Sequence, residues 1–371
     1  MDASPVEMLG EGESFHGYVI KRLLGKGGLG AVYLARHEIL DSDFAIKVLP
    51  PGTDPEFVKR FLREAKLATR LRHRNLVAVH DCGVDERRGL YFLVMDYVDG
   101  GDLRQEIAFS GRIERTRALD IVYQVASALS EAERYGVVHR DIKPENIMID
   151  ASGVVKVVDL GVAKADGLND SLRTTAKTVF GTPAYVSPEQ AIDASRVDVR
   201  ADIYSLGVVF FEMLTGRCPY EGKTMARMLQ QILSEDPMPD VRDVQPDVPA
   251  EYADLVRRMC AKDRECRISD TATLLAEIER LRGGTRPQEA VRSAASLLPP
   301  RTMAEYINSI PDAEADVRTF ETEDREIQAV VDRLRRRKRL NRIRKIVAMA
   351  LAAILTVGLV VLVWRVSHGN G

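Results

Sequence analysis

The first 282 residues of the chain show two kinds of hydrophobic spacing, one after the other. Short apolar runs of strand length come first, and apolar residues spaced like one face of a helix become more common later. The expected strands cover residues 18–24, 31–36, 44–49, 76–82, 90–96, 146–149 and 154–158. The expected helices cover residues 54–71, 118–135, 202–214, about 224–235, 251–261 and 270–282. Gly283 and Gly284 are typical of a helix end, so a folded domain is expected to finish there.

The chain changes character after residue 282. Scattered hydroxyl residues and four prolines precede an acid-rich patch at 312–326, which predicts a flexible linker over residues 283–332. The prolines are Pro287, Pro299, Pro300 and Pro311. Near the end of this linker, some apolar residues fall close to helical spacing, so a short helix there is an alternative to a fully flexible linker. Residues 333–345 then carry nine bases and no acid.

Residues 346–363 contain neither a charge nor a proline, and Trp364 extends this run to nineteen residues. A helix of that length spans about 27 Å, close to the ~30 Å hydrocarbon core of a bilayer. A buried core helix is the alternative, although it would normally show polar periodicity. The bases at 333–345 would then lie in the cytoplasm beside anionic lipid, with residues 365–371 outside. We therefore expect a single-pass anchor in the cell membrane, with the folded domain cytoplasmic.

Composition narrows the picture further. The net charge of −2 over 371 residues argues against wholesale binding of nucleic acid. Residues 1–15 carry acids and no base, and we expect them to form a loose acidic lead. This start lacks a basic stretch followed by an apolar run, so no secretory signal is expected. The cysteines show no zinc spacing and are expected to be reduced thiols. They are Cys82, Cys218, Cys260 and Cys266.

Residues 25–32 read G-K-G-G-L-G-A-V. Glycines in the pattern G-x-G-x-x-G let backbone N–H groups close over a phosphate, because no side chain blocks it. A plain flexible hairpin or a dinucleotide-binding fingerprint would read similarly. The dinucleotide version needs a helix directly after the glycines, whereas a strand is expected at 31–36. We interpret the segment as a hairpin lid over a nucleotide. The expected contacts are Gly25, Lys26, Gly27, Gly28, Leu29, Gly30 and, on the adenine, Val32.

Lys47 lies inside the apolar strand at 44–49. A lysine there either reaches water along the strand edge or is buried with an assigned partner. Glu64 is the candidate partner, and the pair would hold the ammonium on the α- and β-phosphates of a nucleotide. Met95 would close the pocket, although a plain core methionine would read the same way. Position along the chain adds further candidate contacts with the nucleotide. These are Ala45; Asp96 and Val98, in a hinge segment whose backbone can hydrogen-bond adenine; and Asp102, near the ribose.

Residues 139–146 read H-R-D-I-K-P-E-N. In this order Asp141 can accept a hydroxyl proton, Lys143 can steady a phosphate in transfer, and Asn146 can hold a metal ion. An ordinary charged loop between two strands is the alternative. Asp159 closes the strand at 154–158 and can coordinate Mg²⁺, or serve only as a turn acid. The combination predicts phosphoryl transfer.

Residues 162–180 are polar and contain several hydroxyl groups. A phosphate on one of these threonines could pair with Arg140 and order the segment, whereas an unmodified mobile surface loop is the alternative. The candidate phosphosites are Thr174, Thr175 and Thr178. Two structural contacts are also expected here. Asp202, at the start of an apolar helix, is placed to brace the backbone of the loop at 139–146, and Arg267 is placed to pair with Glu189.

Together these residues closely resemble the eukaryotic-like serine/threonine protein kinases of bacteria, over about residues 16–282. The resemblance implies an α+β fold of two lobes, strand-rich over about 16–97 and helical over about 98–282. It implies ATP with Mg²⁺, or Mn²⁺, as cofactors. It also implies protein substrates and leaves open a homodimer in which one copy phosphorylates the other.

The resemblance assigns roles residue by residue. Asp141 becomes the catalytic base, acting with Lys143 and the Lys47–Glu64 ion pair, and Asn146 and Asp159 become metal ligands. Lys143 and the Gly-Thr pair at 181–182 are similar to the serine/threonine branch. The chain departs from the family at position 160, where leucine replaces the usual phenylalanine, so changed packing of an inactive state is expected. A pseudokinase scaffold and a small-molecule phosphotransferase are the rival interpretations.

Overall fold

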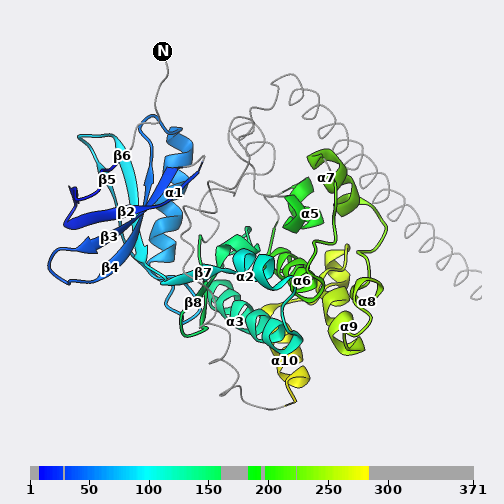
Figure 1. Ribbon diagram of the computed structural model, residues 1–371. Coiled ribbons are helices and arrows are strands. Elements are labelled where there is room, and N and C mark those ends of the chain that lie inside the picture. The colour runs from blue at the N-terminus through cyan, green and yellow to red at the C-terminus, as the bar shows by residue number, and fades with distance from the viewer. Residues whose placement is uncertain (1–7, 28–29, 160–182, 194–196, 223, 284–371) are drawn as a thin grey trace, which may run out of the picture. The chain divides into compact units, whose positions relative to one another are not determined.

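A computed structural model of the protein describes residues 8–27, 30–159, 183–193, 197–222 and 224–283. The strand-rich lobe is built on one antiparallel six-stranded sheet with the order β1-β2-β3-β4-β6-β5 (Figure 1). The strands are β1 (Ser14–Phe15), β2 (Tyr18–Gly27), β3 (Gly30–His37), β4 (Asp43–Leu49), β5 (Val79–Asp85) and β6 (Leu90–Asp96). The expected succession of short strands is therefore confirmed.

Alternation along the strands decides which side chains enter which core. On β4, Ile46 and Val48 enter one apolar cluster, while Leu49 has the opposite parity and packs in another. The second cluster also contains Phe57 and Phe61 of α1 (Pro55–Ala68). This helix begins where Asp54 accepts a hydrogen bond from the Phe57 N–H at 2.9 Å, next to a proline in its first turn.

The sheet begins earlier than the sequence indicates. Residues 8–15 were expected to belong to a loose lead, but Leu9 and Phe15 are buried in the first cluster. Their backbone is also paired, because the Gly12 N–H donates to the Ile20 carbonyl and the Ile20 N–H donates to the Glu13 carbonyl. Two apolar side chains thus outweigh the acidic composition, since burying each stabilises the fold by about 2 kcal/mol.

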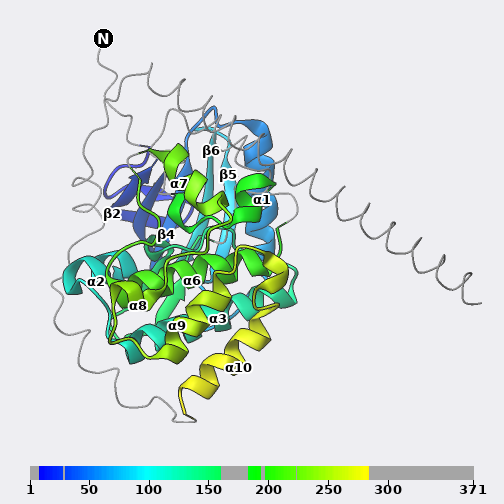
Figure 2. The ribbon, with the colours of Figure 1, turned by 90° about the vertical axis from the view of Figure 1, so that its right-hand side faces the viewer.

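The second lobe is mainly helical and contains a small sheet, β7-β8-β9. Its strands are β7 (Gly100–Asp102), β8 (Ile147–Asp150) and β9 (Val155–Val157). Its α-helices are α2 (Leu103–Ser110), α3 (Arg115–Arg134), α5 (Pro188–Ile192), α6 (Val199–Thr215), α7 (Met225–Leu233), α8 (Val241–Val244), α9 (Ala250–Met259) and α10 (Thr271–Leu281). Short 3₁₀ helices are η1 (Pro144–Asn146), η2 (Pro183–Tyr185) and η4 (Arg264–Cys266). Figure 2 shows α10 beside α3, at the end of the lobe away from the strands.

Helix α6 forms the centre of this lobe. Its residues are buried from Val199 to Leu214 with the exception of Arg200, so nearly every face of the helix contacts protein. A helix that is apolar all round is typical of such a position. Gly216 ends it with a left-handed φ of 75°, and a Cβ there would lie 2.0 Å from the Gly111 carbonyl oxygen. Only glycine therefore fits this contact between α6 and the end of α2.

Several elements differ from expectation. The strand expected at 76–82 begins at Val79, because Leu76 instead forms a parallel bridge with Val157. Helices α2, α5 and α8 and the three-residue strand β7 were not expected either, because elements this short show no clear periodicity.

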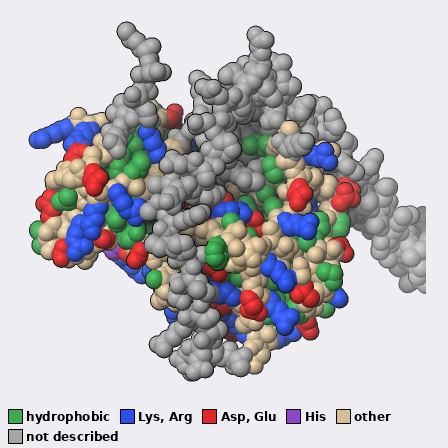
Figure 3. Space-filling view, in the orientation of Figure 1, with side chains coloured by type: hydrophobic (Ala, Val, Ile, Leu, Met, Phe, Trp, Pro, Cys, Tyr) green, Lys and Arg blue, Asp and Glu red, His purple; other side chains and the backbone are tan. Residues whose placement is uncertain are grey.

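On the face that Figure 3 shows, Lys and Arg side chains lie among Asp and Glu side chains over the described residues. Within that described part, no helix is both long and apolar enough to cross a membrane. The span expected at 346–364, the bases at 333–345 and the linker at 284–332 lie outside the described residues. The membrane anchor therefore stays a prediction.

Candidate active site

The glycine segment forms the tip of a hairpin. Strands β2 and β3 pair up to Gly27 and Gly30, and the two residues between them lie outside the described part. Gly30 has a φ of 132°, and a Cβ there would lie 2.1 Å from the Val48 carbonyl oxygen. Glycine is thus required at this position. Because a strand follows the glycines directly, the hairpin expectation is confirmed and the dinucleotide fingerprint is wrong.

An apolar cluster joins the residues that were expected to surround the adenine. Val32, Ala45, Met95 and Val98 all belong to it, although they come from three strands and the segment after β6. Leu24, Leu34, Val77, Tyr97 and Val158 complete the cluster. Val158 directly follows β9, so the cluster includes side chains from both lobes. The structure therefore gathers the apolar candidates at one place.

Lys47 on β4 contacts Asp159 directly, with its Nζ 2.7 Å from Oδ1 of the carboxylate. Burial acts to raise the pKa of Asp159, but the Lys47 ammonium outweighs it and holds that pKa below its ordinary value. The carboxylate is therefore ionised at neutral pH. Glu64 lies on α1, but its side chain is outside the described part, so its ion pair with Lys47 stays a prediction.

The loop at 139–146 is held by one buried carboxylate. Asp202, in the first turn of α6, is 1% exposed and accepts hydrogen bonds from the backbone N–H groups of His139 and Arg140, both at 2.7 Å. This confirms the expected brace. Burial raises the pKa of Asp202 to about 7, against the pull of the two N–H groups and the Arg140 charge. Arg140 has a left-handed φ of 64°, which is unusual for a residue with a side chain and requires such fixation.

The chemical groups of this loop lie close together. Lys143 Nζ is 3.3 Å from Asp141 Oδ2, and Asn146 Nδ2 donates to the same oxygen at 2.9 Å. Asn146 Nδ2 also donates to the Asp141 carbonyl at 2.7 Å. Burial lowers the pKa of Lys143, but Asp141 and then Glu145 outweigh it, so that pKa lies above its ordinary value. Both bonds of Asn146 use its amide nitrogen, which leaves the amide oxygen as the atom able to bind a cation.

Two backbone contacts fix Asp159 beside this loop. His139 Nε2 lies 3.0 Å from the Val158 carbonyl oxygen, and the Val158 N–H donates to the Asn146 carbonyl at 3.0 Å. Asp159 itself has a φ of 54°, again in the left-handed region. These contacts join the end of β9 to residues 139–146, called the catalytic loop below, on both sides. The structure therefore brings together Lys47, Asp141, Lys143, Asn146 and Asp159.

The polar candidates before α2 have other contacts. Asp102 is buried and caps α2, where its Oδ1 accepts from the Gln105 N–H at 2.9 Å, and burial raises its pKa to about 6. Asp96 accepts from the Ala78 N–H at 3.2 Å and lies 2.7 Å from His80 Nε2. The expected contacts of these residues with ribose and adenine stay predictions.

The donor set fits a hard divalent cation. It consists of one carboxylate and one amide oxygen, from Asp159 and Asn146, and oxygen ligands are those preferred by Mg²⁺ and Mn²⁺. Across the described ranges, no three or more His, Cys, Asp or Glu side chains form a cluster that could hold a metal. Mg²⁺ in proteins commonly uses one or two protein oxygens and completes its shell with phosphates and water. The site therefore suits a metal that arrives with a nucleotide.

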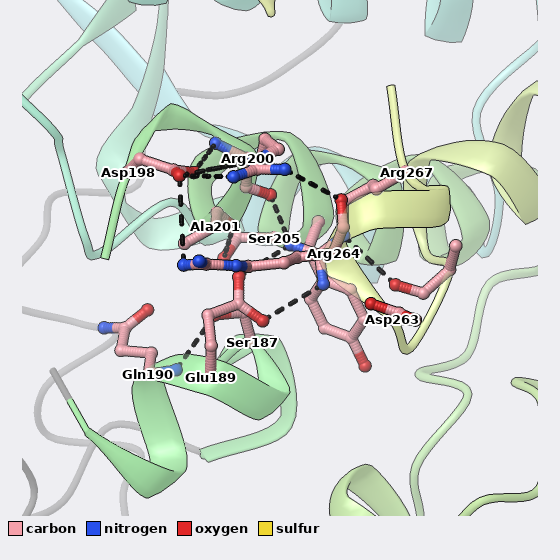
Figure 4. A network of polar contacts seen from close by, with 12 residues as sticks. Ser187, Glu189, Gln190, Asp198, Arg200, Ala201, Ser205, Asp263, Arg264 and Arg267 are labelled. Carbon is pink, nitrogen blue, oxygen red and sulfur yellow. Dashed lines mark hydrogen bonds and ion pairs between the residues drawn. The ribbon is translucent and has the colours of Figure 1, made fainter. Parts of the chain in front are cut away.

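The expected contact between Glu189 and Arg267 is confirmed. Arg267 Nη1 and Nη2 donate to the two carboxylate oxygens of Glu189 at 2.7 and 3.1 Å. Figure 4 shows this guanidinium between Glu189 of α5 and the start of α6, where it also donates to the Arg200 carbonyl at 2.6 Å. The Arg267 side chain is 0% exposed. This buried pair fixes the segment that follows residues 160–182, and Leu160 and the candidate phosphosites within that range lie outside the described part.

Sequence reasoning missed one ionic group beside the catalytic loop. Arg104 of α2 pairs with Glu145 of the loop and with Glu212 of α6. No short motif indicates this set, because the three residues are widely spaced along the chain. The only available signals were a glutamate inside H-R-D-I-K-P-E-N and an acid inside the apolar run of α6.

A strand-rich lobe, a helical lobe and a lysine, an asparagine and two aspartates gathered between them define the two-lobed kinase class of folds. The family model for the protein kinase domain matches residues 18–278, and the chain belongs to this family.

Curated relatives are bacterial serine/threonine kinases. Serine/threonine-protein kinase PrkC of Bacillus subtilis is 39% identical over 264 residues, which cover 71% of this chain and 40% of PrkC. Serine/threonine-protein kinase PknB of Mycolicibacterium smegmatis is 38% identical over 300 residues, covering 77% of this chain and 47% of PknB. The chain therefore spans less than half the length of these relatives.

A solved structure shows the same fold. The crystal structure of the Mycobacterium tuberculosis PknI kinase domain matches with a TM-score of 0.58 and 30% identity. The match covers 73% of this chain and 98% of the PknI chain.

Proposed function

We propose that this protein transfers the γ-phosphoryl group of ATP to serine and threonine hydroxyls of proteins, with Mg²⁺ or Mn²⁺ as the metal. The observation that carries the proposal is the meeting of Lys47, Asp141, Lys143, Asn146 and Asp159 at the junction of the two lobes. The family and its serine/threonine kinase relatives support the same reaction.

Each of these residues has a separate role in the proposed phosphoryl transfer. Asp141 holds the acceptor hydroxyl and takes its proton, while the Lys143 ammonium beside it offsets charge on the phosphate in transfer. Lys47 positions the α- and β-phosphates, and the glycine hairpin covers them with backbone N–H groups. Asn146 and Asp159 hold the metal, which when bound neutralises phosphate charge. The reaction thus depends mainly on positioning and electrostatics.

The direct test uses the purified chain with labelled ATP, a general protein acceptor and either Mg²⁺ or a chelator. We expect label on serine and threonine of the acceptor in the presence of Mg²⁺ alone, with positions assigned by mass spectrometry. A folded chain that binds ATP and labels no protein would support the pseudokinase interpretation instead. Label appearing only on a small molecule would support the small-molecule phosphotransferase.

We also propose that phosphorylation within residues 162–180 activates the enzyme, and that a second copy of the chain carries out this transfer. Among the described residues, the Arg140 Nε atom is buried without a hydrogen-bond partner, which leaves a donor for a phosphate near the catalytic loop. Replacing Thr174, Thr175 and Thr178 together by alanine should lower activity about tenfold or more, as the loss of one charge-assisted hydrogen bond implies. The measurement is the initial rate on an exogenous substrate after preincubation with ATP.

A matched control for this experiment is Ser171→Ala in the same segment. If the triple variant keeps the full rate, or if active enzyme carries no phosphate on these threonines, the activation proposal fails. Autophosphorylation whose rate per molecule is independent of enzyme concentration would contradict the role of the second copy.

Membrane tethering is the last part of the proposal. It is supported by the uncharged run at 346–364 directly after nine bases at 333–345. In bacterial cells the full chain should sediment with membranes and resist carbonate extraction, while deletion of residues 346–364 should release it. Deletion of nineteen linker residues, 288–306, is the control and should leave the chain in the membrane. Full-length protein in the soluble fraction would contradict the anchor.

A further inference from the structure

Arg104 joins three separate segments of the helical lobe. Its Nε donates to Glu145 Oε1 at 3.1 Å, and its Nη1 donates to Glu212 Oε1 at 2.5 Å. Its Nη2 donates to the hydroxyl of Tyr185 in η2. Glu145 belongs to the catalytic loop, and Glu212 lies near the end of α6. One guanidinium of α2 therefore links the catalytic loop, the central helix and the segment after residue 182.

The charges of this group do not balance. Two carboxylates face one guanidinium, and Tyr185 stays neutral because burial and then the Glu212 charge raise its pKa. Glu212 is saturated, since its second oxygen accepts from the Tyr185 hydroxyl at 2.5 Å. Glu145 still has a free acceptor, because its Oε2 is buried and has no hydrogen-bond partner within the described part of the chain. The group thus retains one unused acceptor, Glu145 Oε2, which is buried while Arg104 is in place.

The position of the group relative to the catalytic base follows from the loop itself. Glu145 is four residues after Asp141 and belongs to the same loop as Lys143, whose pKa it helps to raise. The side chains of Arg104 and Glu145 are 22% and 29% exposed, so part of each faces solvent, although Glu145 Oε2 itself is buried. An extended peptide advances about 3.3 Å per residue. A substrate with its hydroxyl at Asp141 therefore brings side chains a few positions away within reach of Glu145.

We infer that Arg104 determines substrate specificity by occupying, from within the chain, a place that would otherwise bind a basic side chain of the substrate. Glu145 and Glu212 each present a carboxylate, and carboxylates bind a guanidinium through pairs of charge-assisted hydrogen bonds. In the wild-type protein three of their four carboxylate oxygens already accept a hydrogen bond. Two of these bonds come from Arg104, and the third comes from the Tyr185 hydroxyl that Arg104 contacts. The enzyme accordingly gains little from an arginine near the phosphoacceptor, and removal of the Arg104 guanidinium converts the place into a subsite for arginine or lysine.

This inference rests on the proposed protein kinase activity. A purely structural role for Arg104 would lower the rates for all substrates by a similar factor, because it would act through the shape of the lobe. A specificity role changes the ratio between substrates. The ratio of kcat/KM for paired peptides is therefore the measurement that separates the two roles.

The experiment uses a phosphoacceptor peptide without charged residues and a set in which each of the four positions on either side is replaced by arginine. For the wild-type protein the best arginine peptide should exceed the neutral one by no more than about twofold. For Arg104→Gln the ratio at one or two positions should rise about tenfold, mainly through KM, which corresponds to about 1.4 kcal/mol. Arg104→Lys keeps the cation and should keep the wild-type ratio.

Two further variants separate the specificity effect from poor folding and from the contribution of Glu145. R104Q/E212Q avoids an unpaired buried charge if Arg104→Gln folds poorly, and it leaves Glu145 open to the substrate, so its ratio should still rise. R104Q/E145Q removes that acceptor, and its ratio should return toward the wild-type value. Arg257→Gln changes an exposed arginine on α9 and serves as the matched control.

The outcomes are distinct. No incorporation into any peptide by the wild-type protein defeats the proposed function itself. Incorporation by the wild type, with an unchanged ratio in both Arg104→Gln and R104Q/E212Q, defeats the specificity inference alone. A strong arginine preference already in the wild-type protein also overturns it, because Arg104 would then not fill the place.

Discussion

Asp141→Asn should retain ATP binding and lose phosphate incorporation by a factor of about a hundred to ten thousand, the range of a general base. Asparagine has the same shape and can still accept a hydrogen bond at Oδ1. It has no basic oxygen to take a proton from the acceptor hydroxyl. The Lys143 ammonium would also lose the carboxylate that lies 3.3 Å away. Binding is measured by fluorescence or calorimetry with ATP-Mg²⁺, and incorporation by labelled phosphate.

Asp120→Asn is a suitable control, because this aspartate lies on α3, pairs with Arg282 and has no proposed part in the reaction. It should change incorporation little. Full incorporation by Asp141→Asn would remove Asp141 from the role of base, and loss of ATP binding in the same variant would show a structural cause.

Arg267→Met should destabilise the protein by about 3–5 kcal/mol, the cost of leaving one partner of a buried ion pair unpaired. The Arg267 side chain is 0% exposed, and its guanidinium lies over the Tyr204 ring with 4.9 Å to the centroid. It also donates to the carbonyls of Ala261 and Arg200 at 3.1 and 2.6 Å. Methionine fills much of the volume but supplies none of these hydrogen bonds. The free energy of unfolding is measured by urea denaturation.

The double variant E189Q/R267M removes the charge that Arg267→Met leaves behind. It should recover part of the lost stability, because the Glu189 carboxylate, whose side chain is only 16% exposed, contributes a desolvation cost of its own. Arg257→Met on the surface of α9 is the control and should shift the free energy by less than about 0.5 kcal/mol. A shift of this small size in Arg267→Met would show that the pair contributes little.

The sequence by itself determined the order of the longer strands and helices and the positions of the chemical groups along the chain. Alternating and helical spacing are local properties, so β6 was placed correctly at residues 90–96 and α6 within three residues at its start. The contacts of Asp202 with the catalytic loop and of Arg267 with Glu189 were also predicted. They follow from residue types at fixed places in motifs rather than from packing.

Only the tertiary structure decided which partner each polar side chain takes. Asp102 is a helix cap as well as a ribose candidate, and Lys47 contacts Asp159, 112 residues away in the sequence. Arg104 faces two carboxylates from distant segments, which no spacing along the chain reveals. The physical reason is the range of the interactions. Periodicity reflects neighbours within a few residues, whereas ion pairs and apolar contacts form between whichever groups the folded backbone brings within a few ångströms.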